Sequence, residues 1–250
     1  MPVDPNTLEP AIRDPKALRR TAIILLVVII AGGIGIIMAY AKLTERQAMD
    51  PRPIFEGRLN ENLGVVRQDG TAGGLLDLDG KVWLACAVCV NQPESWARSR
   101  EVMARLAKHY AGNDQVALVC LTIDPDREPP EVLAKTAKEL GAEVPKWWFA
   151  AAGQEFVQRY LKDKFRLGAL PYQVDGKWVY NPKILVVDKN HHLRAGKNGK
   201  AVVEFDFDRA ASWDAEGKNE GIDKKTNVET MEDVLIRTVD ALLLEPKDNS

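Results

Sequence analysis

The chain has 250 residues, of which 46% are hydrophobic and 28% are charged, and its formal net charge is -2. This length suits one globular domain of ordinary size together with accessory segments. A nearly neutral balance of charges provides no basic surface for nucleic acid, so we expect no nucleic-acid partner. Three cysteines are too few for a disulfide scaffold, and the odd number leaves at least one thiol free or paired with another chain.

Residues 21–41 form an uncharged and strongly apolar stretch between Arg20 and Lys42. The stretch is long enough to cross a bilayer, and it exceeds the apolar core of a usual signal peptide. We therefore expect a transmembrane anchor at 21–41, preceded by an N-terminal tail at 1–20. The alternative is a cleaved signal peptide, because Ala39-Tyr40-Ala41 resembles a cleavage site.

Positive charges flank this anchor on both sides in similar number, but Arg19 and Arg20 lie directly at its N-terminal edge. The positive-inside rule then favours a cytoplasmic N-terminus and an extracytoplasmic globular part. Residues 42–60 are polar and contain Pro51 and Pro53, which is typical of a tether. The chain is thus predicted to be a single-pass membrane protein.

The remaining residues, 61–250, alternate between strand and helix patterns. Nearly continuous apolar runs, typical of buried strands, cover 81–90, 116–123 and 183–187. Helical spacing of apolar residues follows Pro93 and recurs over 131–140, 153–165 and 230–244. Strands that alternate with helices predict an α/β domain, with a charged excursion at 206–227.

Three segments of this domain have a distinctive order and spacing. They are residues 77–83 (DLDGKVW), residues 122–127 (TIDPDR) followed by 130–133 (PEVL), and residues 148–149 (WF) followed by 153–155 (GQE). In these segments the chain resembles the Sco/SenC family of copper chaperones for respiratory oxidase assembly. The resemblance runs from about Leu63 to the last helix and implies a thioredoxin-like sheet flanked by helices on a membrane anchor. A peroxiredoxin-like or other thioredoxin-like protein is the main alternative.

The chain departs from that family at the copper ligands. Family members carry two cysteines, four residues apart, where the central strand meets the next helix. The resemblance places these cysteines on Gln92 and Trp96, and Pro93 keeps the family's proline. The family's copper-binding histidine falls on Tyr180, or on Gly176 in a second alignment. Because copper prefers thiolate, thioether or imidazole ligands, we expect no tight copper binding at this site and no thiolate for disulfide exchange.

Five other residues are candidate replacement ligands. Cys86 and Cys89 form a C-x-x-C, but positions three apart on a strand face opposite sides of the sheet. A redox pair also needs its first cysteine at a helix N-terminus, so we expect two buried, unreactive side chains. Cys120 lies in another predicted strand and could approach either of them. His191 and His192 are expected in a solvated turn.

Four aromatic residues map, through the resemblance, to the rim of the family's copper pocket: Trp96, Tyr172, Trp178 and Tyr180. Since aromatic side chains are favoured in interface cores, one hypothesis is a contact surface for a partner protein. The alternative is that Trp96 only fills a vacated cavity. We predict a non-catalytic accessory or assembly factor of a respiratory membrane complex, such as an oxidase, without a cofactor. A copper chaperone with replacement ligands and a thiol–disulfide oxidoreductase are the alternatives.

Overall fold

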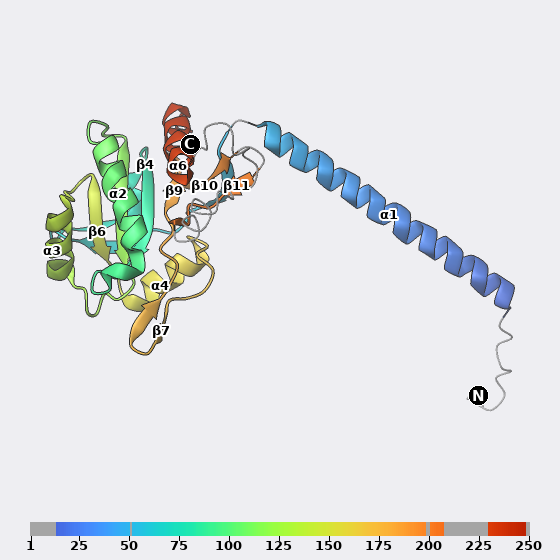
Figure 1. Ribbon diagram of the computed structural model, residues 1–250, viewed down its shortest axis with the longest axis horizontal. Helices are drawn as coiled ribbons and strands as arrows, with labels where there is room; N and C mark the ends of the chain where they lie inside the picture. Colours follow the sequence, from blue (N-terminus) through green and yellow to red (C-terminus); the bar gives the residue numbers. More distant parts are fainter. Residues whose placement is uncertain (1–13, 51, 199–200, 208–229, 249–250) are drawn as a thin grey trace, which may run out of the picture. The chain divides into compact units, whose positions relative to one another are not determined.

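The computed structural model describes residues 14–50, 52–198, 201–207 and 230–248 (Figure 1). The chain divides into two units, Met1–Pro51 and Arg52–Ser250. A charged excursion was predicted at 206–227. Only residues 206 and 207 of it are among the described residues.

The first unit contains one long helix, α1 (Pro15–Met49). Its segment Pro15–Leu43 is long and apolar enough to cross a membrane, either as an anchor or as a signal sequence. A helix suits a bilayer because all its backbone groups are satisfied internally. The span predicted at 21–41 lies within this segment. However, the helix continues to Met49, so that much of the predicted tether is helical.

The second unit is built on one mixed sheet, in the order β1-β10-β9-β4-β5-β6-β2-β3, with β11 paired to β10. The strands of this sheet are β1 (Ile54–Arg58), β2 (Gly64–Arg67), β3 (Ala72–Gly74), β4 (Val82–Val88), β5 (Val116–Thr122), β6 (Trp147–Ala151), β9 (Leu185–Val187), β10 (His192–Asn198) and β11 (Ala201–Val203). The pairs β4–β5 and β5–β6 are parallel, and the other pairs are antiparallel.

The centre of the sheet is formed by two continuous apolar runs of the domain, β4 and β5. All residues of β4 and β5 are buried, and the pair is in register from Val82 and Val116 to Val88 and Thr122. Strands that are covered on both faces need apolar residues at every position, which is why these runs do not alternate. The strands predicted at 81–90 and 116–123 are therefore confirmed.

The end of the predicted tether belongs to the sheet. Strand β1 forms its edge and pairs antiparallel with β10, with a register shift between Phe55 and Gly57. Pro53 directly precedes the strand, where no ladder hydrogen bond requires its missing N–H group. The compact unit that contains the sheet begins at Arg52, whereas the predicted domain starts at residue 61.

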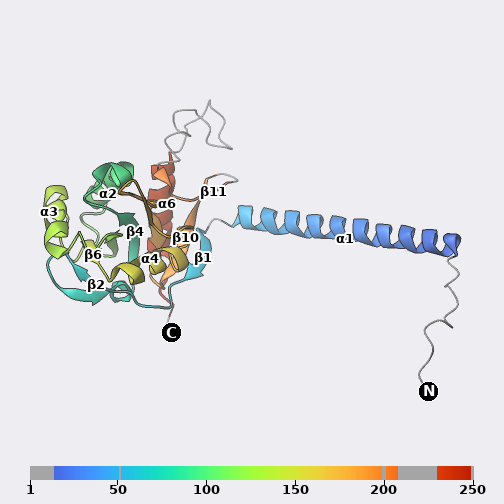
Figure 2. The ribbon, with the colours of Figure 1, turned by 90° about the horizontal axis from the view of Figure 1, so that it is seen from below.

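Helices cover both faces of the sheet (Figures 1 and 2). They are α2 (Ala97–His109), α3 (Pro130–Leu140), α4 (Gln154–Asp163) and α6 (Met231–Leu244), together with the short 3-10 helices η2 (Leu75–Leu78) and η3 (Pro93–Trp96). Apolar residues of α2, α3 and α6 pack on the face of β4 that carries Leu84 and Cys86. Residues of α4 and η2 pack on the opposite face, which carries Trp83 and Ala85. The predicted α/β sheet with flanking helices is confirmed.

Local sequence signals fix the ends of these helices. Helix α3 stops at Gly141, whose φ of 68° is a left-handed C-terminal cap. Helix α6 begins after Thr230, whose hydroxyl accepts the backbone N–H of Asp233. The Asp233 carboxylate accepts in return from the Thr230 backbone, which completes a capping box.

Candidate functional site

The candidate site lies where the chain leaves the central strand. Strand β4 ends at Val88, and η3 begins at Pro93. Proline suits the first helical position, because its fixed φ fits a helix and the missing N–H would have no partner there. Asp124 follows β5 at the same edge of the sheet. In α/β sheets this edge, beyond the carboxyl ends of parallel strands, is where ligands usually bind.

A separate hairpin lies against this edge. Strands β7 (Tyr172–Val174) and β8 (Lys177–Val179) are antiparallel and are joined by Asp175 and Gly176. Both turn residues have positive φ, 50° and 74°, as a type I′ turn requires. The Asp-Gly dipeptide between two short β-prone runs is the sequence signal for this hairpin, which our sequence analysis did not use.

Gln92 fastens the hairpin to the start of η3. Its side-chain Oε1 accepts the backbone N–H of Trp178 at 2.9 Å, and its Nε2 donates to the carbonyl of Gly176 at 3.5 Å. One end of the amide therefore binds the turn at Gly176, and the other end binds strand β8 at Trp178. A second contact is made by the Trp178 indole, which donates from Nε1 to Asp124 Oδ2 at 2.8 Å. We call these three hydrogen bonds the hairpin latch.

Tyr180 closes the site beside the latch. Its hydroxyl oxygen accepts the backbone N–H of Cys89 at 2.9 Å and lies 2.7 Å from Ser95 Oγ. Because Ser95 gives its own hydroxyl hydrogen to the Gln92 carbonyl, the Tyr180 hydroxyl donates to Ser95. Burial raises the pKa of Tyr180 well above its ordinary value, so the residue is a neutral phenol and not an anionic ligand.

Trp96 belongs to the core and not to the surface. It is 1% exposed, and its ring meets Phe149 edge-on with the two ring centroids 6.0 Å apart. The hypothesis that Trp96 is part of an exposed contact surface is therefore wrong, because the first turn of the helix directs its side chain under α2. Of the four aromatic residues, Tyr172 is exposed and Trp178 and Tyr180 are half-buried.

A fully buried carboxylate supports the loop between β4 and η3. Glu128 is 0% exposed and accepts the backbone N–H of Asn91 at 2.7 Å and the hydroxyl of Thr122. The Cys89 thiol also donates to Glu128, at 3.3 Å. Glu128 was not predicted as a site residue, because an acid in the polar turn after β5 has no local signal that distinguishes it from a solvated one.

The environment of Cys89 makes its thiol unreactive. Burial raises the pKa of Cys89 to about 12, and the negative charges of Glu128 and Asp124 add to the effect. A nucleophile or a copper(I) ligand must be a thiolate. In this pocket both the burial and the neighbouring carboxylates disfavour the thiolate.

The five candidate replacement ligands are not brought together. Cys86 faces one side of the sheet and lies 3.7 Å from Cys120, sulfur to sulfur, whereas Cys89 follows the strand and faces the other side. His191 and His192 lie near the opposite end of β4, because β9 runs antiparallel to it. Each has an acidic partner: His191 lies 3.3 Å from Asp79, and His192 lies 3.2 Å from Asp188. Within the part of the chain that the structure describes, no group of three His, Cys, Asp or Glu residues could hold a metal ion.

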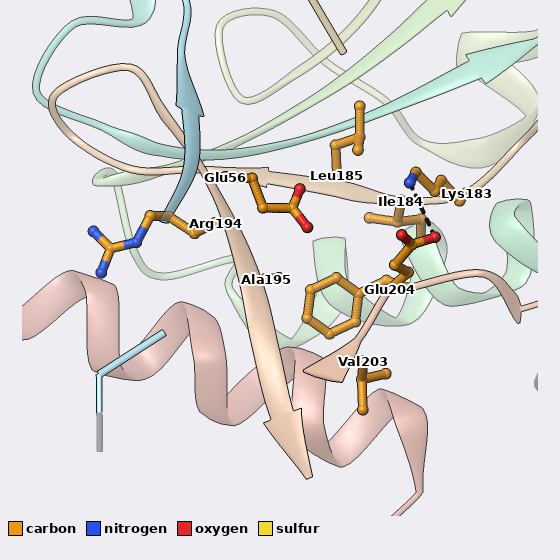
Figure 3. A pocket seen from close by; sticks show the side chains of 9 residues that line it. Glu56, Lys183, Ile184, Leu185, Arg194, Ala195, Val203 and Glu204 are labelled. Carbon is orange, nitrogen blue, oxygen red and sulfur yellow. Dashed lines mark hydrogen bonds and ion pairs between the residues drawn. The ribbon is translucent and has the colours of Figure 1, made fainter. Parts of the chain in front are cut away.

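A small cavity lies elsewhere in the domain, between β1, β9 and β11 (Figure 3). It measures about 10 Å³, which is room for about one water molecule. The buried Lys183 at its wall forms an ion pair with Glu204 at 3.4 Å. This cavity is too small for a substrate.

No protein-family model and no curated protein matches this sequence. Among solved structures, the chain is similar to a SCO1/SenC family lipoprotein from Bacillus anthracis str. Ames, with 21% identity, 76% of this chain and 99% of that chain covered, and a TM-score of 0.53. It is also similar to BsSco, a member of the Sco family of cytochrome c oxidase assembly proteins, with 19% identity, coverage of 77% and 98%, and a TM-score of 0.52. A putative electron transfer protein from Aquifex aeolicus VF5 matches with 11% identity, coverage of 67% and 98%, and a TM-score of 0.52.

The fold is that of the Sco/SenC structures. The predicted resemblance is confirmed at this level, because the likeness covers nearly the whole of those chains. A fold hosts many functions, so the function has to be argued from the site. In this chain the site holds the Gln92 amide engaged by the hairpin latch, the buried indole of Trp96 and the neutral phenol of Tyr180.

Proposed function

We propose that this chain is a membrane-anchored, non-catalytic accessory or assembly factor of a respiratory membrane complex, with a Sco/SenC-like fold that carries no copper at the family's site. The observation that carries the proposal is the hairpin latch: the side chain at the first ligand position is committed to holding the protein's own backbone. An assembly role is supported by the likeness to BsSco, which belongs to a family of cytochrome c oxidase assembly proteins.

Copper transfer requires ligands that can bind the ion and then release it to another protein. Gln92 can meet an ion only by breaking its bonds to Trp178 and Gly176, which would release the hairpin. Trp96 offers only an indole N–H, which is a donor and not a ligand. The acidic proton of Tyr180 is retained because burial raises its pKa. None of the three positions supplies the soft donor that copper(I) prefers.

The same features argue against a thiol–disulfide oxidoreductase. Such an enzyme needs a thiolate of lowered pKa at a helix N-terminus, and in this chain Gln92 and Pro93 stand at that place. Cys89 has the opposite property, a raised pKa. We further propose that α1 is an uncleaved anchor with a cytoplasmic N-terminus, so that the domain acts outside the cytoplasm.

Copper titration of the reduced full-length chain in detergent tests the proposal. We expect the wild type to bind Cu(I) no more tightly than a variant in which Cys86, Cys89 and Cys120 are all replaced by Ala, measured in competition with a chromogenic Cu(I) chelator. Stoichiometric Cu(I) held with sub-nanomolar affinity by the wild type alone would overturn the proposal and favour a chaperone with replacement ligands.

The outer side of the hairpin is the surface that we propose for the partner. Tyr172 and Val179 are directly paired across the strands and are 52% and 40% exposed, and Val174 on the same side is 49% exposed. Lys177, the cross-strand partner of Val174, lies on the same side. The latch holds this face in a fixed position, which lowers the entropy lost on binding. This surface replaces the predicted one, because Trp96 is buried.

Replacing both Tyr172 and Val179 with Ala is expected to reduce the recovery of respiratory-oxidase subunits at least tenfold when the tagged chain is purified in mild detergent. Loss of a central aromatic contact commonly costs about 2 kcal/mol or more in binding. Phe156→Ala is the matched control, because Phe156 is 69% exposed but lies on α4. Recovery of the oxidase subunits is measured by quantitative mass spectrometry. Equal recovery with the wild type, the double variant and Phe156→Ala would argue against this surface.

A further inference from the structure

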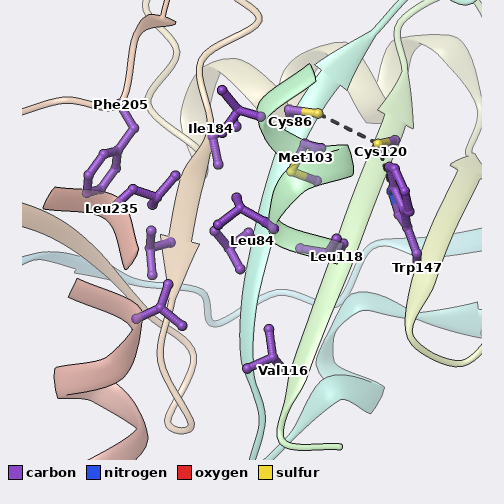
Figure 4. Close-up of a cluster of buried hydrophobic side chains, with 14 of the residues drawn as sticks. Leu84, Cys86, Met103, Val116, Leu118, Cys120, Trp147, Ile184, Phe205 and Leu235 are labelled. Carbon is purple, nitrogen blue, oxygen red and sulfur yellow. Dashed lines mark hydrogen bonds between the residues drawn. The ribbon is translucent and has the colours of Figure 1, made fainter. Parts of the chain in front are cut away.

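Two of the three cysteines face each other across the centre of the sheet (Figure 4). Cys86 on β4 and Cys120 on β5 are direct partners in the parallel register. Both are 0% exposed and lie on the face of the sheet that α2 and α6 cover. Their sulfur atoms are 3.7 Å apart.

The backbone already has the separation that a disulfide needs. Adjacent strands lie about 4.7–4.9 Å apart, and disulfides join residues whose Cα atoms are about 4.4–6.8 Å apart. Only the two sulfurs have to approach, from 3.7 Å to about 2.05 Å. Cys89 cannot take part, because its thiol is on the other face and donates to Glu128.

We propose that Cys86 and Cys120 form a buried cross-strand disulfide, which is made while the chain folds. In the first step, the thiolate of one cysteine attacks an oxidant disulfide and displaces one thiol. In the second step, the other cysteine's thiolate attacks the mixed disulfide and displaces the second thiol. The sulfur–sulfur bond of the oxidant is thus replaced by the Cys86–Cys120 bond, and the two protons are carried by the two thiols released from the oxidant.

Oxidation has to precede complete folding, because the folded core protects both thiols. The hydrogen bond with Cys120 and burial raise the pKa of Cys86 well above its ordinary value, and no oxidant reaches a side chain that is 0% exposed. In the unfolded chain both thiols are open to solvent and react readily. The same burial protects the finished disulfide from thiol reductants.

Refolding of the full-length chain in detergent tests this proposal. The chain is unfolded and reduced, refolded with oxidised and reduced glutathione, and then unfolded again in excess N-ethylmaleimide. We expect one maleimide adduct on Cys89, with the intact mass of a chain that has lost two hydrogens, and a digest in which the peptides of Cys86 and Cys120 are linked. Near-ultraviolet circular dichroism of the refolded chain should show native tertiary structure.

Two variants serve as controls. Cys89→Ala should carry no adduct, and Cys120→Ala should carry two, on Cys86 and Cys89. Three adducts on the refolded wild type would overturn the proposal, as would glutathione retained on Cys86 or Cys120, a Cys86–Cys89 bond, or a linked chain without native structure. The wild-type result decides the question even if a variant does not fold. The adduct count does not depend on copper binding or on partner capture. The proposed function could therefore be disproved while the disulfide is confirmed, and the reverse is equally possible.

Discussion

Replacing Trp96 with Ala is expected to lower the free energy of unfolding by about 3–5 kcal/mol, because large-to-small changes of buried aromatic residues leave a cavity. Trp96 is 1% exposed and packs against Phe149 between α2 and the sheet. Guanidinium unfolding of the full-length chain in detergent, followed by near-ultraviolet circular dichroism, measures this change.

Trp96→Phe is the matched control for this prediction. The Trp96 Nε1 atom is buried and has no hydrogen-bond partner among the described residues, so the smaller ring removes no bond and keeps most of the contact with Phe149. We expect the Phe variant to lose less than half as much stability as the Ala variant. A small loss in both variants would mean that the residue at this position is not part of the core.

Cys89 in the folded chain is expected to react with iodoacetamide about a thousandfold more slowly at pH 8 than in the unfolded chain. A thiol whose pKa is about 12 is a thiolate in roughly one molecule in ten thousand at pH 8, whereas a thiol with the ordinary pKa of about 8.5 is a thiolate in roughly one in four. Digestion and mass spectrometry after timed labelling give the rate for Cys89 separately from the other cysteines.

The pH dependence of this rate identifies its cause. With the pKa raised, the thiolate fraction increases about tenfold per pH unit throughout pH 7 to 10, without a plateau. Glu128→Gln removes one negative charge beside the thiol and should increase the rate, but only in part, because burial is the first cause of the raised pKa. A plateau near pH 9 in the wild type would contradict the prediction, since it would show an ordinary thiol.

The sequence was sufficient to predict the central strands, the helices and the resemblance to Sco/SenC proteins. Continuous apolar runs at β4 and β5 have few alternatives to a buried strand, and Gly141 and Thr230 mark helix ends by local chemistry. Strand β1 was missed because its five residues form an edge strand with mixed burial. Such a strand is stabilised by pairing with β10, a contact distant in sequence.

For the candidate site, the resemblance named three residues, but it did not predict their contacts. Alignment with the family located Gln92, Trp96 and Tyr180, and all three lie at the junction of β4 and α2 or beside it. Whether an aromatic residue at a helix start points inward or outward depends on packing with Phe149, which is 53 positions away in the sequence. The roles of Glu128 and Ser95 depend in the same way on partners that only the folded chain brings together.

The hairpin latch also limits how this protein could change in evolution. A Gln92→Cys substitution would supply one thiol and at the same time remove both bonds between that side chain and the backbone of Gly176 and Trp178. A single change towards a metal ligand at this position would therefore loosen the adjacent hairpin before any ion could be held. The exposed residues on the outer side of the hairpin make none of the latch bonds, so they are freer to vary than Gln92.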